Sequence, residues 1–148
     1  MRRLPRMLIR RALFGLLLAS PAAARSFAER GVAVRGTDVV AYFTEGRVVR
    51  GRAEHAAEWD GVRWLFASAA HRARFLADPA AHVPAYGGFC AWAVSQGYTA
   101  PTDPNAWRIV EGRLFLNYDQ AIKRRWERDI PGHIAQGDAN WPRLNQAG

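Results

Sequence analysis

The sequence predicts a small single domain of the α+β class, in which two β-hairpins are accompanied by interspersed helices. Two dipeptides, Asp60-Gly61 and Glu111-Gly112, each stand between apolar stretches, a pattern typical of tight hairpin turns. Residues that cap helices stand before the apolar segments that follow these hairpins. Strand and helix patterns do not alternate regularly, which favours α+β over a parallel sheet.

The first 24 residues have the three parts of a cleaved signal peptide. Arginines come first, the apolar stretch 12–19 follows, and Pro21 precedes the small residues 22–24. We therefore expect cleavage near Ala24, a mature domain over 25–148, and a periplasmic or secreted protein. The apolar stretch is too short to cross a bilayer, so no permanent membrane anchor is expected.

The export route has two readings. Arg10-Arg11, followed by an alanine and two large apolar residues, matches a twin-arginine signal, which carries proteins already folded. The same pair also occurs by chance in an ordinary basic start, and the general secretory route is the favoured one. A mitochondrial transit peptide ranks lower, because the leader lacks the serine content and polar face of such peptides.

The formal net charge of +8 does not indicate a nucleic-acid partner. Five arginines and no acidic residue lie within 1–24, so the rest of the chain carries only +3. That is an ordinary surface charge for a small domain. No nucleic acid is therefore expected among the partners, and no protein partner is identified.

The first half of the mature chain predicts four main elements. Residues 32–34 form a short strand, and Asp38 caps a helix over 39–43. A second strand is expected at 48–50. The hairpin then pairs 55–59 with 62–66.

Ser68 caps the next expected helix, over 69–77, and Asp78-Pro79 either ends that helix or starts another short one.

The second half begins with a loop through Gly87-Gly88, followed by a short apolar segment at 91–95. A second hairpin pairs 107–110 with 113–118. Asp119 caps a helix over 120–129, which Pro131-Gly132 is expected to end. The remaining tail is expected to pack on the domain through Trp141.

Segments spread over most of the chain resemble the YHS family of domains, in its exported bacterial subgroup. The resemblance covers 31–142 and is carried by 36–43, by 64–68 with His71, Phe75, Asp78-Pro79 and His82, by 86–91, by 114–118 and by 140–142. It implies a YHS-like α+β domain. The family's metal-binding role, as the resemblance implies it, depends on cysteines.

This chain departs from the family pattern at those cysteines. Where the pattern has them, the chain has Ala41, Ala67 and His71, and His82 stands at the position of the named tyrosine. Alanine cannot ligate a metal. The usual soft-metal site is therefore absent in its standard form.

Cys90 is the only cysteine, so an intramolecular disulfide is excluded. Three interpretations stay open: a buried small apolar side chain, a thiolate that binds metal, or a reactive redox thiol. His71 is four residues before Phe75 and is expected on the same helical face, at the core or its edge. A structural histidine is the more common case there.

The leading hypothesis is nevertheless a transition-metal module in which Cys90 and His71 bind copper or zinc, since both ligands suit those metals. The alternatives are a thiol-dependent redox or enzyme partner that uses Cys90, and a non-catalytic structural or interaction domain. Six tryptophans favour a ring-filled core over an aromatic-lined pocket for a sugar, peptide or hydrophobic ligand. No catalytic serine, phosphate-loop or dinucleotide motif is present, which favours a non-enzymatic role.

Overall fold

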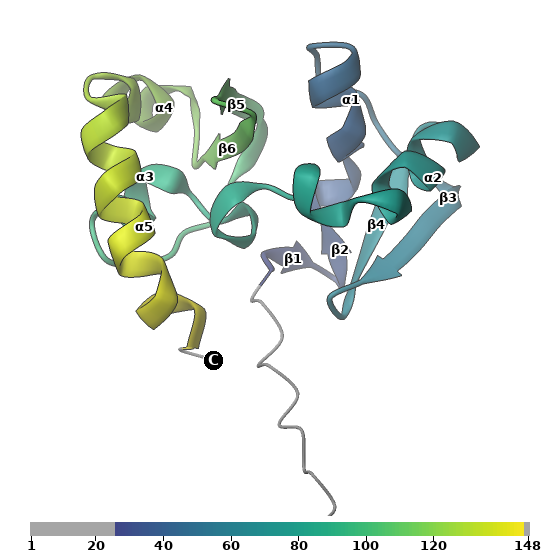
Figure 1. Ribbon diagram of the computed structural model, residues 1–148, viewed down its shortest axis with the longest axis horizontal. Helices are drawn as coiled ribbons and strands as arrows, with labels where there is room; N and C mark the ends of the chain where they lie inside the picture. Colours follow the sequence, from purple (N-terminus) through teal and green to yellow (C-terminus); the bar gives the residue numbers. More distant parts are fainter. Residues whose placement is uncertain (1–25, 147–148) are drawn as a thin grey trace, which may run out of the picture.

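The computed structural model describes residues 26–146 and confirms the α+β class (Figure 1). It combines a four-stranded sheet, a separate two-stranded hairpin and five α-helices within these residues. The predicted signal peptide, its cleavage point at Ala24 and the twin-arginine pair lie outside the described residues.

The four-stranded sheet contains the first predicted hairpin. Its spatial order is β1-β2-β4-β3, and every pair is antiparallel except β2 with β4, where Val32 pairs with Arg63. Asp60 and Gly61 both have positive φ, 55° and 70°, as the tight turn requires. The strands are β1 (Ala28–Glu29), β2 (Val32–Ala33), β3 (Arg52–Trp59) and β4 (Val62–Phe66).

Two predicted helix caps are confirmed in this half. Helix α1 (Val39–Thr44) begins after Asp38, and α2 (Ala69–Ala77) begins after Ser68, whose hydroxyl accepts from the His71 amide. A short 3-10 turn follows α2 at Pro79–Ala81. Local capping chemistry therefore sets where both helices start.

The strand predicted at 48–50 is wrong, because only Arg50 forms an isolated bridge, with Thr37. The reason is a close crossing at the next residue. The Gly51 amide donates to the Gly36 carbonyl, and a Cβ on Gly51 would collide with the Leu65 backbone. This close approach lies one residue before β3 pairs with β4 at Arg52 and Phe66.

The second predicted hairpin is confirmed, with a longer first strand than expected. Strand β5 (Asp103–Val110) pairs antiparallel with β6 (Arg113–Asn117), and the register shifts between Asp103 and Trp107. A 3-10 segment (Ala85–Gly88) and the short helix α3 (Ala91–Ser95) precede this hairpin. Asp119 caps α4 (Gln120–Glu127), as predicted.

The predicted helix over 120–129 ends at Glu127, before Pro131-Gly132, but the expectation that this dipeptide stops helical structure is wrong. Helix α5 (Ile130–Gln146) runs through this dipeptide and forms most of the tail. Pro131 lies in the first turn, where a helix needs no amide donor, so proline is tolerated. Trp141 packs on Tyr86 and Phe89, with ring centroids 6.0 and 6.1 Å apart, which confirms that the tail packs through this tryptophan.

The buried side chains form two clusters, one in each half of the molecule. The first centres on Trp64 and Phe75 beneath the four-stranded sheet, and the second on Trp126 and Phe115 beneath α5. Strand β6 contributes side chains to both clusters, because Leu114 and Leu116 face the first cluster while Phe115 faces the second. Figure 1 shows α2 and α3 on opposite sides of the β5–β6 hairpin.

None of the helices within 26–146 is both long enough and apolar enough to cross a lipid bilayer.

Candidate functional site

The Asp38 carboxylate is the most heavily hydrogen-bonded acidic group in the described part of the chain. It is fully buried, and Oδ1 accepts from the amides of Val40 and Ala41 at 2.9 and 3.2 Å. Oδ2 accepts from the amide of Ala67 at 2.9 Å and lies 2.7 Å from Nδ1 of His71. One side chain therefore ties together the start of α1, the end of β4 and the first turn of α2.

His71 is held in one orientation by this contact. Its Nδ1 donates to Asp38, which leaves Nε2 directed outward, 3.4 Å from the hydroxyl of Thr44. The side chain is 19% exposed while Phe75 is fully buried, so the predicted position at the edge of the core is confirmed. A carboxylate that orients an imidazole in this way is common behind metal-binding histidines.

Cys90 lies in the other half, at the residue before α3, and is 1% exposed. Its Sγ lies 3.6 Å from Oδ1 of Asn117. Burial raises the pKa of the thiol above its ordinary value, and hydrogen bonds from the amides of Ala93, Tyr118 and Trp92 only partly oppose this. Cys90 is therefore a protonated thiol at neutral pH, which argues against a resting nucleophile.

Asn117 is a site residue that sequence reasoning missed. Its Oδ1 accepts from the Trp92 amide at 3.0 Å, so it caps the first turn of α3 from the end of β6. Its Nδ2 is buried without a hydrogen-bond partner, one of two such side-chain atoms among residues 26–146. Nothing in the local sequence marks this asparagine, because its partners lie 25 and 27 positions away along the chain.

A small cavity of about 230 Å³ opens beside Cys90, and we call it the aromatic pocket. Tyr98 and Tyr118 are 48% and 53% exposed. Trp92 meets Tyr98 edge-on, with centroids 6.3 Å apart, and the Arg125 guanidinium lies 5.1 Å from the Trp92 ring. The lining consists almost entirely of apolar atoms from Cys90, Trp92, Ala93, Tyr98, Ala100, Tyr118 and Ile122.

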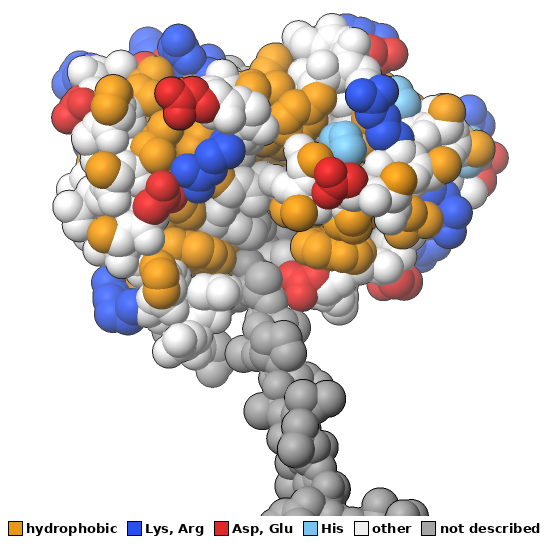
Figure 2. Space-filling view, in the orientation of Figure 1, with side chains coloured by type: hydrophobic (Ala, Val, Ile, Leu, Met, Phe, Trp, Pro, Cys, Tyr) orange, Lys and Arg blue, Asp and Glu red, His pale blue; other side chains and the backbone are white. Residues whose placement is uncertain are grey.

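The two predicted metal ligands have no contact partners in common. His71 touches Asp38 and Thr44 in the half that holds α1 and α2, where histidine side chains reach the surface in Figure 2. Cys90 touches Asn117, the last residue of β6, at the start of α3. The pairing of Cys90 with His71 stays a prediction, and no contact of either side chain supports it.

His82 is occupied by contacts of its own. Nδ1 of His82 lies 2.8 Å from the Asp78 carbonyl oxygen, and the ring is buried edge-on against Phe43. Across the described residues, no three histidine, cysteine, aspartate or glutamate side chains are grouped so that they could hold a metal ion.

Comparisons of the chain with protein-family models, with curated proteins and with solved structures found no match.

Proposed function

We propose that this chain is an exported YHS-like domain that works by binding a small uncharged apolar molecule in the aromatic pocket. The observation that carries the proposal is that Tyr98 and Tyr118 flank one cavity with Cys90 in its wall. They are two of the three large apolar side chains exposed within 26–146. Exposed rings gathered at one hollow are a feature of binding sites, whereas scattered ones are not.

The chemistry of the wall sets the ligand class. A protonated Cys90 thiol behaves as a small apolar group, and the rings of Trp92 and Tyr98 offer an edge and a face for an aromatic ligand. Tyr98 and Tyr118 also carry phenol hydroxyls, which can supply one or two polar contacts. Such a wall favours a planar, neutral compound over an ion or a sugar.

The size of the pocket sets the expected affinity. A volume of about 230 Å³ is below the range of drug-sized sites, so the occupant has about ten non-hydrogen atoms. At about 0.4 kcal/mol per atom, such a ligand gains about 4 kcal/mol, which corresponds to a dissociation constant near 1 mM.

An NMR titration of the mature protein with indole tests the proposal. We expect saturable shifts at the amides of Trp92, Ala93 and Tyr118 with a dissociation constant in the millimolar range. Ala100→Leu should abolish these shifts, because it fills the pocket from its wall. Leu76→Ala is the matched control, since Leu76 is the third exposed large apolar residue and lies outside the pocket.

Shifts that stay linear with indole, or that are the same in Ala100→Leu and the unaltered protein, would reject the pocket as a binding site. Thermal unfolding of each variant without indole shows that the fold is intact before the comparison is made.

A transition-metal function is the second candidate, favoured by the 2.7 Å contact between Asp38 and His71. The carboxylate leaves Nε2 of His71 as the imidazole atom available to copper or zinc. Thr44 lies beside that nitrogen, and the described residues offer no further histidine, cysteine or carboxylate grouped with it. Any metal there is held by a single strong protein donor.

Thermal unfolding with added copper or zinc, compared in His71→Ala and Cys90→Ala, separates metal binding by His71 alone from metal binding by Cys90 and His71 together. Loss of metal stabilisation in His71→Ala alone places the metal at the imidazole. Loss in both variants supports the predicted pairing of Cys90 with His71. Unchanged unfolding of the parent protein with either metal removes the metal function altogether.

A further inference from the structure

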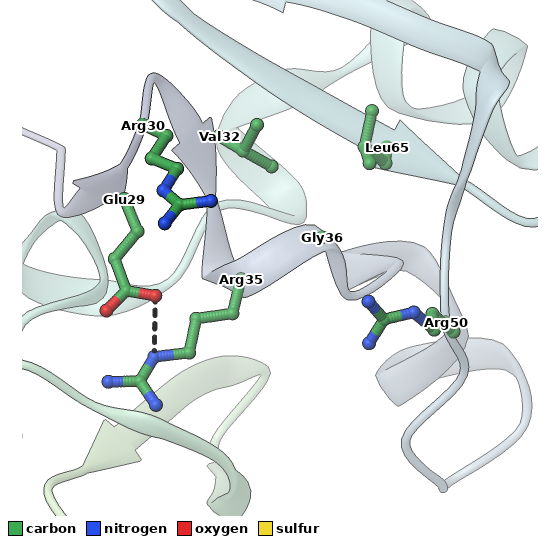
Figure 3. A pocket seen from close by; sticks show the side chains of 7 residues that line it. All are labelled: Glu29, Arg30, Val32, Arg35, Gly36, Arg50 and Leu65. Atoms are coloured by element: carbon green, nitrogen blue, oxygen red, sulfur yellow. Dashed lines mark ion pairs between the residues drawn. The ribbon is translucent and has the colours of Figure 1, made fainter.

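A hollow of about 650 Å³ lies on the face of the four-stranded sheet that points away from the core. Leu65 lines it, while its neighbours Trp64 and Phe66 are buried on the opposite face. We call it the arginine hollow, because three of its seven lining residues are arginines (Figure 3). The lining is Glu29, Arg30, Val32, Arg35, Gly36, Arg50 and Leu65.

The charges in the arginine hollow are not balanced. Nε of Arg35 pairs with Oε2 of Glu29 at 3.2 Å, which leaves a net charge of two positive units on the lining. Arg30 and Arg50 form no ion pair with any residue of 26–146. Figure 3 shows the Arg50 side chain reaching back from the opposite side toward the segment that carries Gly36.

The backbone holds two of these arginines in a conformation that arginine rarely adopts. Arg30 and Gly31 form the two-residue turn between β1 and β2, with φ of 50° and 78°. Turns of this kind favour asparagine or glycine at both positions. Arg35 also has a positive φ, 49°. Side chains kept at unfavourable backbone positions are typical of functional sites.

We propose that the arginine hollow binds a small molecule that carries a phosphate dianion. Guanidinium groups match phosphate oxygens with paired N–H donors, and two unpaired guanidiniums balance the two charges of the dianion. Val32 and Leu65 offer an apolar floor to the organic part of a phosphomonoester. This site is separate from the aromatic pocket, because the two share no residue.

Calorimetric titration of the mature protein with phenyl phosphate and with inorganic phosphate tests this site. We expect one site, weakened by salt, and an affinity about tenfold lower or worse in Arg30→Gln/Arg50→Gln, since charged hydrogen bonds contribute at least this much. The matched control is Arg74→Gln/Arg124→Gln, which removes the same charge at exposed helix positions outside the hollow.

A third variant gives an effect of opposite sign. Glu29→Gln removes the carboxylate that competes for Arg35, so it should tighten phosphate binding by severalfold. A merely general attraction of anions to a basic protein would weaken as much in Arg74→Gln/Arg124→Gln as in Arg30→Gln/Arg50→Gln, because both pairs remove the same charge.

Two results would overturn the proposal. One is an equal loss of affinity in the hollow and control variants. The other is that free phosphate and phenyl phosphate do not bind, while vesicles of phosphatidylglycerol bind and vesicles of phosphatidylcholine do not. That result would identify an anionic membrane surface as the partner in place of a small molecule. A failure of indole to bind leaves this test unaffected, because it uses different residues.

Discussion

Gly137 of α5 packs directly against the side chain of Tyr86, so closely that a Cβ at this position would lie 2.8 Å from Cζ of the ring. Tyr86 cannot easily move away. Its hydroxyl donates to Asp138 at 3.0 Å, and its backbone has a positive φ of 59°. The contact joins the 3-10 segment before α3 to the middle of α5.

We therefore predict that Gly137→Ala destabilises the protein by about 1–3 kcal/mol, as overpacking does in other cores. Helix propensity alone predicts the opposite sign, a gain of about 1 kcal/mol. Urea unfolding of this variant distinguishes the two. Tyr86→Phe combined with Gly137→Ala should recover part of the loss, and strict additivity of the two changes would contradict a direct contact.

The hydrogen bonds to Asp38 predict unequal effects of two substitutions. Asp38→Asn keeps the shape of the side chain, but the Ala67 amide and the His71 ring lose the oxygen that accepts their hydrogen bonds. We expect the free energy of unfolding to fall by about 3 kcal/mol or more. His71→Ala leaves the three amide donors in place and should cost about 1–2 kcal/mol.

Denaturant unfolding of both variants at pH 7 checks the order. His55→Ala, at a histidine of β3 outside this network, is the control. Equal losses for Asp38→Asn and His71→Ala would show that the histidine is the carboxylate's only important partner.

Stability should fall at alkaline pH. Burial raises the pKa values of Tyr42, Tyr86 and Cys90, so each group ionises in the unfolded chain before it ionises in the folded one. The unfolded state then binds fewer protons, and the free energy of unfolding declines as pH rises above about 9. Below the unfolded-state pKa values the stabilising contribution is fully present.

The slope should approach about 1.4 kcal/mol per pH unit for each such group. Tyr86→Phe and Cys90→Ala should each flatten the decline measured by urea unfolding between pH 8 and 11. Tyr98→Phe, at an exposed phenol, is the control. A parent protein whose unfolding free energy is constant over this interval would contradict the burial of these groups.

Features set by neighbouring residues could be predicted from the sequence. Asp38, Ser68 and Asp119 cap their helices by contacts within three residues, and the Asp60-Gly61 turn depends only on local backbone conformation. These signals identified both hairpins and three of the five helices with their starting residues.

Features set by long-range packing could not be predicted in this way. Helix α5 continues past Pro131, and the segment through Arg50 is bent away from a strand by the crossing of Gly51 over Leu65. In the candidate sites, Asp38 was identified as a cap but not as the partner of His71, which lies 33 positions away. Asn117 carried no local signal of its role beside Cys90.

The buried amide of Asn117 gives a prediction whose sign changes with pH. Asn117→Asp keeps an oxygen for the Trp92 amide, but at neutral pH it also places a carboxylate in a fully buried position. Desolvation would raise the folded-state pKa of the new carboxyl above its unfolded value near 4. The folded protein therefore accommodates the protonated carboxyl, whereas the charged carboxylate lowers the free energy of unfolding.

Urea unfolding of Asn117→Asp should give a stability close to that of the parent protein near pH 3.5, then a deficit that grows to about 3 kcal/mol or more at pH 7. Gln136→Glu, at an exposed position of α5, introduces the same charge and should show no such growth. A deficit that is constant between pH 3.5 and 7 would mean that the cost comes from lost packing and that the buried charge plays no part.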